Sequence, residues 1–346
     1  MLPTTLLITN KTNIAYLSRF RGSNGVLLLH KDKGYLFTDA RYHIVAKKVL
    51  PSDFSIIDIT KGFDDPWQKL LNKLCPSLIG YEGEDIGLSL FNRVKKISKK
   101  VKFENVNHAI NELRMAKTED EIRLIKKAQS ITDDLLTELK KTIRAGMSEL
   151  DIAWKIRLLA HELGADDISF EPIVAINENA AAPHHQNSSR KLKIGDRLLI
   201  DMGVIYQGYC SDMTRVLFSK KPTEFEQKIY TIVWTAQEQA IANIRANKRG
   251  KEIDEIARKV ITEAGFGEYF NHSLGHGIGL DVHELPNLSS RYDKVLVEHS
   301  VVTSEPGIYI EGKIGVRLED MVIVGVEKAV NITKSPKELS ACMMNL

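Results

Sequence analysis

The chain has 346 residues and a mass of 39.0 kDa, a length that suggests two domains at roughly 100–200 residues each. Hydrophobic residues make up 43% and charged residues 27%, a globular balance that excludes a disordered or collagen-like chain. Forty-eight Lys and Arg residues against forty-five Asp and Glu residues leave a formal net charge of +3. This charge is too balanced to indicate a nucleic acid or an anionic membrane as a partner.

Targeting and redox signals are also absent from the sequence. No apolar stretch approaches the ~20 residues of a membrane span, and residues 1–5 lack the basic start and apolar core of a signal peptide. The three cysteines, Cys75, Cys210 and Cys342, are odd in number and widely spaced, so neither a disulfide framework nor a thiolate zinc site is indicated. We therefore expect a cytoplasmic protein with no membrane partner.

The first ~110 residues alternate short apolar runs with helical patterns, which is typical of an α/β domain. The expected strands are residues 6–9, 14–17, 25–30, 34–38, 54–59, 78–81 and 101–103, and the expected helices are residues 40–49, 66–75 and 89–98. Asp39, Arg41 and Tyr42 form a polar cluster that a capped turn at the start of a helix explains. Nothing in this stretch assembles a chemical site.

A long helix is predicted from Thr118, because Thr118 and Glu121 have the spacing of a capping box. Apolar residues then recur every three or four positions, and the helix should end near Gly146. Ser148 should cap a second helix that ends at Gly164.

The same plan returns later in the chain. Thr223 should cap a helix running to about Ala246, and residues 253–261 should form a second helix that Gly265 ends. Residues 149–153 and 252–257 are also alike. We interpret this as a duplicated unit of two helices and β-rich sequence with a site at the junction of its halves, although two helix pairs can also look alike by chance.

Two β-rich runs flank Gln207-Gly208, a reasonable two-residue hairpin turn. With that turn, Tyr206 faces Tyr209 and Asp201 faces Thr214. Asp212 then projects from the same face as Asp201, as its diagonal neighbour at roughly 7–8 Å. Two carboxylates on one buried face repel each other, and a bound cation resolves that repulsion. A solvated face is the alternative.

Three histidines, His272, His276 and His283, lie in one stretch of twelve residues. This stretch is rich in glycine and therefore forms a helix poorly. Glycines let the backbone come close to a ligand and aim side chains that a regular element could not. A single histidine is usually structural, but three of the ten in the chain within one short segment favour a site.

Two further carboxylates interrupt β-prone segments. Glu305 precedes Pro306, which holds it in extended geometry on a strand or bulge, and Glu319 interrupts the run 315–324. An exposed edge strand would explain either glutamate taken alone. With Asp201, Asp212 and one histidine, they form an oxygen-rich set that suits Mn²⁺, with Co²⁺, Fe²⁺ and Zn²⁺ compatible. So many carboxylates suggest two bridged ions, as in aminopeptidases and phosphatases.

These residues and the sequence segments around them resemble the pita-bread metallopeptidases, in the Xaa-Pro aminopeptidase and Xaa-Pro dipeptidase (prolidase) branch. The segments are residues 201–203, 211–215, 275–284, 305–309 and 316–320. The resemblance runs from about Arg114 to Val326. It implies an α+β fold, in which a pita-bread catalytic domain (residues 113–346) follows a smaller α/β, creatinase-like N-terminal domain (residues 1–112).

The resemblance also implies a role for each matching residue. The metal ligands would be Asp201 on one ion, His276 on the other, Asp212 and Glu319 bridging both, and Glu305, which is also the implied general base. His184 and His283 would position the substrate and stabilise the tetrahedral intermediate. His272 and Arg317 would line the substrate pocket, and His185 would be a bystander. Arg317 could instead orient Glu319, or form a surface ion pair.

The implied activity is hydrolysis of the bond between an N-terminal residue and proline, by a water held between two divalent ions. A homodimer is also implied. Cleavage of dipeptides alone, as in a prolidase, is the first alternative. A catalytically silent binding module and a metal-free, creatinase-like hydrolase are disfavoured, because all five ligands and the flanking histidines are present.

Overall fold

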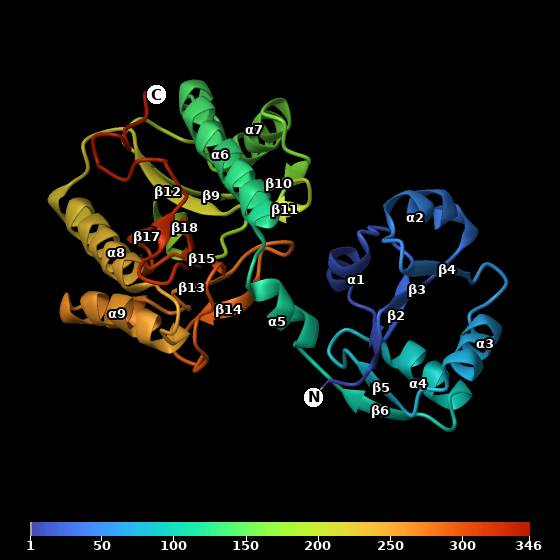
Figure 1. The fold of residues 1–346 in the computed structure, drawn as a ribbon. Coiled ribbons are helices and arrows are strands. Elements are labelled where there is room, and N and C mark those ends of the chain that lie inside the picture. The colour runs from blue at the N-terminus through green and yellow to red at the C-terminus, as the bar shows by residue number, and fades with distance from the viewer. Residues whose placement is uncertain (1) are drawn as a thin grey trace. The chain divides into compact units, whose positions relative to one another are not determined.

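The computed structural model describes residues 2–346 and divides the chain into two compact units, one ending at Leu113 and one spanning Arg114–Leu346 (Figure 1). Among the helices of residues 2–346, none is both long enough and apolar enough to cross a membrane.

The first unit is a six-stranded sheet of order β4-β3-β2-β1-β5-β6, covered by helices on both faces. Its strands are β1 (Thr5–Ile8), β2 (Val26–His30), β3 (Lys33–Thr38), β4 (Phe54–Asp58), β5 (Leu78–Tyr81) and β6 (Lys102–Asn105). Its helices are α1 (Lys11–Ser18), α2 (His43–Val49), α3 (Asp64–Leu74), α4 (Leu88–Ile97) and α5 (Ala109–Met115), which continues past the unit boundary. Trp67 and Val94 bring α3 and α4 into one core cluster, whereas Ile14 and Ala46 bring α1 and α2 into another.

One predicted strand of this unit is wrong, because residues 14–17 lie in helix α1. The side chain of Asn10 caps that helix by accepting a hydrogen bond from the backbone N–H of Asn13 at 2.9 Å. A short apolar run fits a strand or one helical turn equally well, and here the cap decides for the helix. The capped turn at Asp39 is confirmed, since its carboxylate accepts from the backbone N–H of Arg41.

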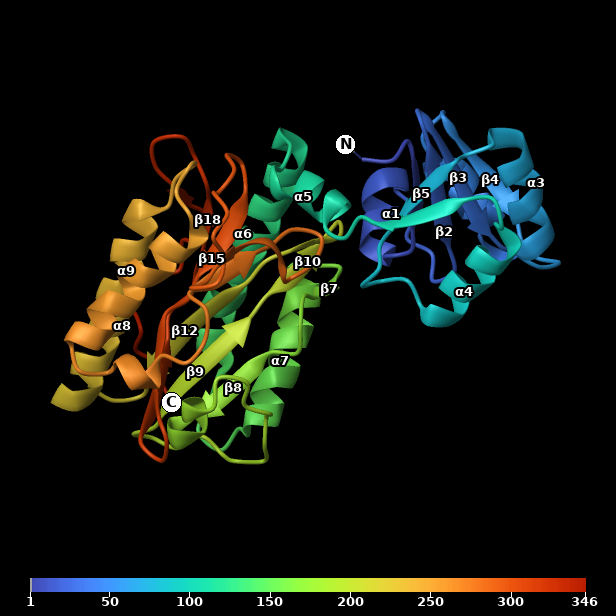
Figure 2. The same ribbon diagram turned by 90° about the horizontal axis from the view of Figure 1, so that it is seen from below.

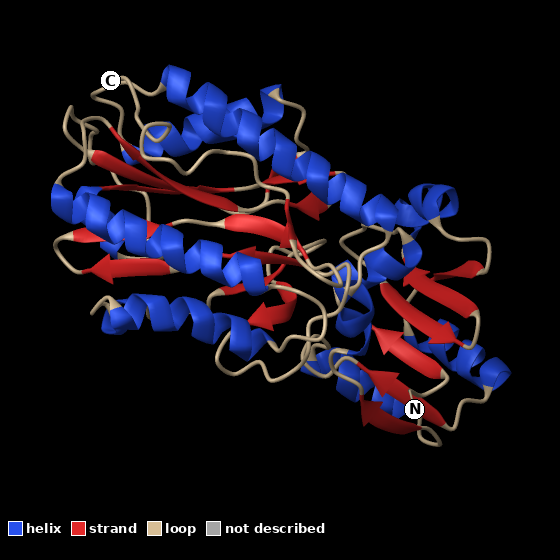
Figure 3. Cartoon of the chain, turned by 60° about the vertical axis from the view of Figure 1, so that its left-hand side comes forward, coloured by secondary structure: helices blue, strands red, loops and turns tan. Residues whose placement is uncertain are grey.

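The second unit contains two helix pairs with strands between them (Figures 2 and 3). The helices are α6 (Glu119–Thr142), α7 (Glu149–Glu162), α8 (Glu224–Asn243) and α9 (Gly250–Glu263). Thr118, Ser148 and Thr223 cap the first three of them, each within a capping box, as expected. Helix α6 ends at Thr142 rather than near Gly146, because Ile143 is already extended (ψ 135°).

Three groups of strands build the interior of this unit. One sheet has the order β12-β9-β8, a second has the order β14-β13-β15-β18-β19, and β16 pairs only with β17. Their bounds are β8 (Ile173–Ile176), β9 (Arg197–Met202), β12 (Met213–Phe218), β13 (Gly275–Gly277), β14 (Glu284–Leu288), β15 (Val301–Ser304), β16 (Gly307–Ile310), β17 (Ile314–Arg317), β18 (Asp320–Ile323) and β19 (Val330–Asn331). A small sheet of order β11-β10-β7 joins β7 (Asp167–Ile168), β10 (Val204–Tyr206) and β11 (Tyr209–Cys210).

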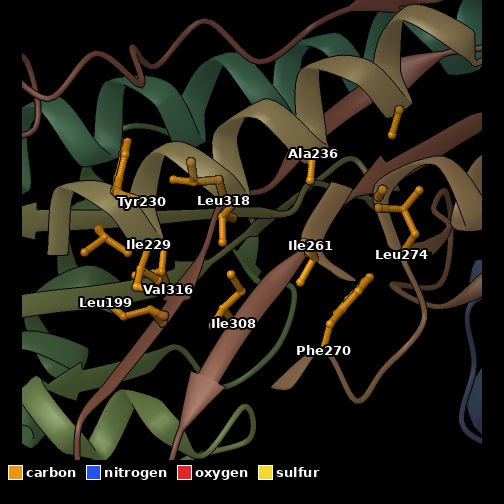
Figure 4. Close-up of a cluster of buried hydrophobic side chains, with 14 of the residues drawn as sticks. Leu199, Ile229, Tyr230, Ala236, Ile261, Phe270, Leu274, Ile308, Val316 and Leu318 are labelled. Atoms are coloured by element: carbon orange, nitrogen blue, oxygen red, sulfur yellow. The ribbon is translucent and has the colours of Figure 1, made fainter. Parts of the chain in front are cut away.

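Each helix pair packs on its own apolar core, as a duplicated unit requires. The core of α8 and α9 is drawn in Figure 4, and it contains Ile229, Tyr230 and Ala236 of α8 together with Val316 and Leu318. The core of α6 and α7 contains Leu198 and Ile200 of β9, whereas Leu199 belongs to the α8 and α9 core. Strand β9 is therefore buried on both faces, between the two halves.

Candidate metal centre and substrate cavity

The register of the central hairpin confirms the predicted strand pairing. Asp201 on β9 is paired with Thr214 on β12, and Tyr206 is paired with Tyr209 nearer the turn. Asp212 directly precedes β12. The two aspartates are 8% and 4% exposed, so the alternative of a solvated face is wrong.

His276 is brought to these aspartates by β13. An added Cβ on Gly275 would lie 2.1 Å from the carbonyl oxygen of Thr303, so β13 can approach β15 only with glycine beside the histidine. The glycines are expected to bring the backbone close to a ligand. At Gly275 the close approach is instead to the neighbouring strand β15. The His276 Nδ1 lies 3.1 Å from the carbonyl oxygen of Gly277, and Nε2 faces Asp212 and Glu305 at 3.8 and 3.2 Å. With Nδ1–H donating to this carbonyl, Nε2 is the ring atom available for a cation once it carries no proton.

Glu305 and Glu319 lie where strand pairing is interrupted, between β15 and β16 and between β17 and β18. The backbone N–H of Glu305 donates to the carbonyl of Leu274 at 2.8 Å, and that of Glu319 donates to the carbonyl of Thr214 at 3.2 Å. Glu319 is 1% exposed and Glu305 is largely buried, so the edge-strand explanation fails for both.

The arrangement has the properties of a cation site. One oxygen or nitrogen from each of Asp212, His276 and Glu319 lies within 4.8 Å of the others. Three buried carboxylate oxygens, Oδ1 of Asp201, Oδ1 of Asp212 and Oε1 of Glu319, have no hydrogen-bond donor. Buried anionic oxygens without a donor are costly unless a cation takes them. The donor set therefore fits hard divalent ions.

The electrostatics agree with this reading. Burial, and then the negative charges of Glu319 and Asp201, raise the pKa of Asp212 well above its ordinary value. Burial and the charge of Glu305 do the same to the pKa of Glu319. For Glu305, burial is outweighed by the hydrogen bond from His276, which lowers its pKa to about 2. Crowded like charges of this kind are relieved by bound cations.

Arg317 connects the carboxylates to the rest of the cavity. It is 3% exposed, so it forms no surface ion pair, and its Nη2 donates to Oδ2 of Asp201 at 2.7 Å. Its Nε donates to Oγ1 of Thr214 at 3.0 Å, and Thr214 in turn donates to Oε2 of Glu319 at 2.7 Å. Arg317 thus contacts Asp201 directly and reaches Glu319 only through Thr214.

Tyr309 is a site residue that sequence reasoning did not single out. Its hydroxyl accepts from Nη1 of Arg317 and lies 2.9 Å from Nε2 of His272. The other ring nitrogen of His272 lies 2.8 Å from the carbonyl oxygen of Ser273, so both nitrogens have protein partners. The available signal in the sequence is the position of Tyr309 in the segment 305–309, four residues after Glu305. A tyrosine at this position also fits an ordinary strand.

All of the predicted site residues line one cavity of about 590 Å³. It is lined by Asp201, Asp212, His276, Glu305, Glu319, His184, His272, His283 and Arg317, together with Phe170, Glu171, Ile173, Pro183, Ser273, Gly275, Val282 and Asn287. The ring of His283 stands edge-on to that of His276, with their centroids 4.4 Å apart. His185 is not among the lining residues and contacts the carboxylate of Glu149 at 2.8 Å.

Known proteins are similar to this chain in sequence and fold. A family model described as metallopeptidase family M24 matches residues 123–325, and one described as the creatinase/prolidase N-terminal domain matches residues 4–116. The Xaa-Pro dipeptidase of Pyrococcus furiosus is 34% identical over 335 residues, which cover 96% of this chain and 94% of that protein.

Solved structures agree over nearly the whole chain. An Xaa-Pro dipeptidase from Bacillus anthracis has a TM-score of 0.94 and 36% identity, covering 99% of this chain and 95% of its own. An X-Pro aminopeptidase from Thermotoga maritima has a TM-score of 0.91 and 36% identity, covering 99% and 98%. The expected fold class is confirmed. The chain belongs to metallopeptidase family M24, with a pita-bread catalytic domain after a creatinase-like N-terminal domain, and it is a hydrolase.

Proposed function

We propose that the protein is an Xaa-Pro aminopeptidase, which hydrolyses the peptide bond between an N-terminal residue and proline. The observation that carries this proposal is the set of three donor-less, buried carboxylate oxygens beside His276 in the wall of one cavity. The similar proteins named Xaa-Pro dipeptidase and X-Pro aminopeptidase support the substrate class.

The metal ligands in this proposal are Asp201, Asp212, His276, Glu305 and Glu319. When bound, two divalent ions, with Mn²⁺ as the proposed native metal, supply a nucleophilic water and polarise the scissile carbonyl. Glu305 lines the cavity beside His276 and is the proposed acceptor of the proton that the water loses.

The cavity histidines are proposed to stabilise the negative charge that develops on the scissile carbonyl group. Burial and the neighbouring His276 lower the pKa of His283, which is therefore a neutral imidazole near pH 7 and can donate a hydrogen bond. We propose that His184, on the same cavity, positions the substrate with it, and that His272 and Arg317 complete the substrate pocket. Proline offers no amide N–H, so its ring must be recognised by shape. Phe170, Ile173 and Val282 supply an apolar lining for that purpose.

The direct test uses two ligand variants and one control. Asp212→Asn and Glu319→Gln should reduce Mn²⁺-dependent release of the residue before proline to background, because each removes one proposed bridging carboxylate. Glu327→Gln, which changes an exposed glutamate outside the cavity, should retain full activity. Undiminished turnover in either ligand variant would contradict the proposal.

A prolidase that cleaves only dipeptides is the second candidate, which the dipeptidase relatives favour. Purified protein, stripped with a chelator and reloaded with Mn²⁺, Co²⁺ or Zn²⁺, should cleave Xaa-Pro-Yaa tripeptides if the aminopeptidase assignment is right. Cleavage of Xaa-Pro dipeptides alone supports the prolidase, and metal binding without cleavage of either class supports a silent binding module.

We further propose that the protein is a cytoplasmic homodimer, as the family resemblance implies. Light scattering coupled to gel filtration should then give twice the chain mass of 39.0 kDa. A mass of one chain at micromolar concentration would contradict the dimer.

A further inference from the structure

Strand pairing is interrupted at the two glutamates of the metal centre. Strand β15 pairs with β18 as far as Ser304 and Asp320, and β16 pairs with β17 from Gly307 and Arg317. Glu305 and Glu319 fall between these two ladders, where one long hydrogen bond, from the N–H of Leu318 to the carbonyl of Pro306 at 3.4 Å, crosses the gap. Buried carbonyl groups at such a break need donors from elsewhere.

A glutamine from helix α8 supplies them. Gln237 is fully buried, and its Nε2 donates to the carbonyl of Ser304 at 2.9 Å and to the carbonyl of Leu318 at 3.0 Å. These two carbonyls belong to the residues directly before Glu305 and Glu319. A side-chain amide nitrogen carries two hydrogens, so both are used on the two ligand-bearing segments. The neighbouring Ala236 and Leu318 pack in the core of Figure 4.

The direction of this amide is fixed from its other end. Nζ of Lys337 donates to Oε1 of Gln237 at 2.7 Å, which turns Nε2 toward the break. Lys337 also contacts Oδ2 of the buried Asp320, at 2.6 Å, next to Glu319 in the chain. A lysine ammonium is a donor only, so it selects the oxygen of the amide and excludes the flipped arrangement.

We propose that Gln237 is a positioning residue for the metal centre: its amide fixes the spacing of the segments that carry Glu305 and Glu319, and Lys337 fixes the amide. This inference rests on the proposed function, since it concerns the two-ion site. Without the amide, the carbonyls of Ser304 and Leu318 each lose the donor that joins them across the break, and the segments must shift or admit water. The two carboxylates then lose the mutual geometry that shared ions require.

The test measures metal affinity in the full-length chain. Protein stripped with a chelator is titrated with Mn²⁺ alone in a calorimeter, and its unfolding temperature is measured in parallel. Gln237→Met keeps the side-chain length and removes both donors. The control is Gln129→Met on α6, where another fully buried glutamine makes one side-chain hydrogen bond within residues 2–346, to the sulfur of Met213 at 3.9 Å.

We expect Gln237→Met to bind Mn²⁺ about 10–100-fold more weakly. Gln129→Met should stay within about threefold of the wild type even where it lowers the unfolding temperature as much, because loss of a buried amide alone does not move the ligands. Wild-type affinity in Gln237→Met overturns the inference, and so does an equal loss of affinity in Gln129→Met.

A second variant covers the case in which Gln237→Met does not fold. Lys337→Met keeps the amide but frees it to turn, so a lower Mn²⁺ affinity supports the inference and wild-type affinity overturns it. Wild-type protein that binds no Mn²⁺ rejects the proposed function and this inference with it. Wild-type protein that binds and cleaves, beside a Gln237→Met variant with unchanged affinity, rejects only the positioning role.

Discussion

Arg317 reaches four partners with one planar group. Its guanidinium donates to Asp201, Thr214 and Tyr309 at 2.7–3.0 Å, and to the carbonyl of Pro183 at 3.3 Å. A lysine carries its three donors on one nitrogen and cannot reach these separate partners at once. The arginine thus holds one proposed ligand directly and a second through a hydroxyl.

Arg317→Lys should therefore weaken the metal centre although the positive charge is kept. We expect Mn²⁺ affinity, or activity at limiting Mn²⁺, to fall about 10–100-fold. Metal titration of the stripped protein measures this. Arg249→Lys is the matched control, because Arg249 pairs with Asp293 at the surface and neither residue lines the cavity. Equal Mn²⁺ affinity in Arg317→Lys and the wild type would show that a positive charge at this position is enough to support the metal centre.

At the scale of an element, the start of helix α7 holds a loop of the cavity through one buried carboxylate. Its first residue, Glu149, is fully buried and holds the loop that carries His184. Its carboxylate accepts from the backbone N–H groups of Ile176 and Ser188 and from the side chain of Asn179, and it contacts His185. His185, expected to be a bystander, thus pairs with the residue that anchors this loop.

Glu149→Gln should lower the free energy of unfolding by about 3 kcal/mol near neutral pH, because an amide cannot accept from all of these donors. Burial raises the pKa of Glu149, but hydrogen bonds led by that of His185 outweigh burial and lower it. The ionised carboxylate therefore stabilises the fold above pH 4.5, and this contribution is lost as the pH falls through the lowered pKa.

Urea unfolding between pH 3 and pH 7 measures the difference in unfolding free energy between the wild type and Glu149→Gln. This difference should become smaller toward pH 3. Asp151→Asn, which alters only the exposed capping box of α7, should cost about 1 kcal/mol or less. A Glu149→Gln penalty as small as that of Asp151→Asn would contradict the anchoring role.

Local signals in the sequence predict much of this fold. Capping boxes at Thr118 and Ser148 mark helix starts, and the Gln207-Gly208 turn sets the register that places Asp201 opposite Thr214. Signals that depend on distant contacts are missed. Gln237 lies 67 and 81 residues from the two carbonyls that it holds. The helical spacing places it on the buried face of α8, but nothing local identifies these partners.

At the scale of the whole molecule, each unit has its own apolar core. We propose that the domain boundary lies at residues 112–113 and that the two domains unfold separately. All proposed ligands lie in Arg114–Leu346. Saturating Mn²⁺ at about 100 times its Kd should stabilise that unit by about 2.7 kcal/mol and raise its midpoint by roughly 5–10 °C.

Differential scanning calorimetry with chelator and with Mn²⁺ should then show two transitions, of which only one moves. A fragment of residues 1–116, which keeps α5 whole, should reproduce the unmoved transition. One cooperative transition that shifts as a whole on adding Mn²⁺ would contradict independent domains.

The position of Lys337 in the chain has a consequence for biosynthesis. This lysine comes after all five proposed ligands in the sequence, yet it fixes the amide between two of them. A ribosome delivers residues in order, so the lysine that completes the support of the metal centre is made after all of the ligands. We therefore expect stable ion loading to begin only once translation has passed this residue.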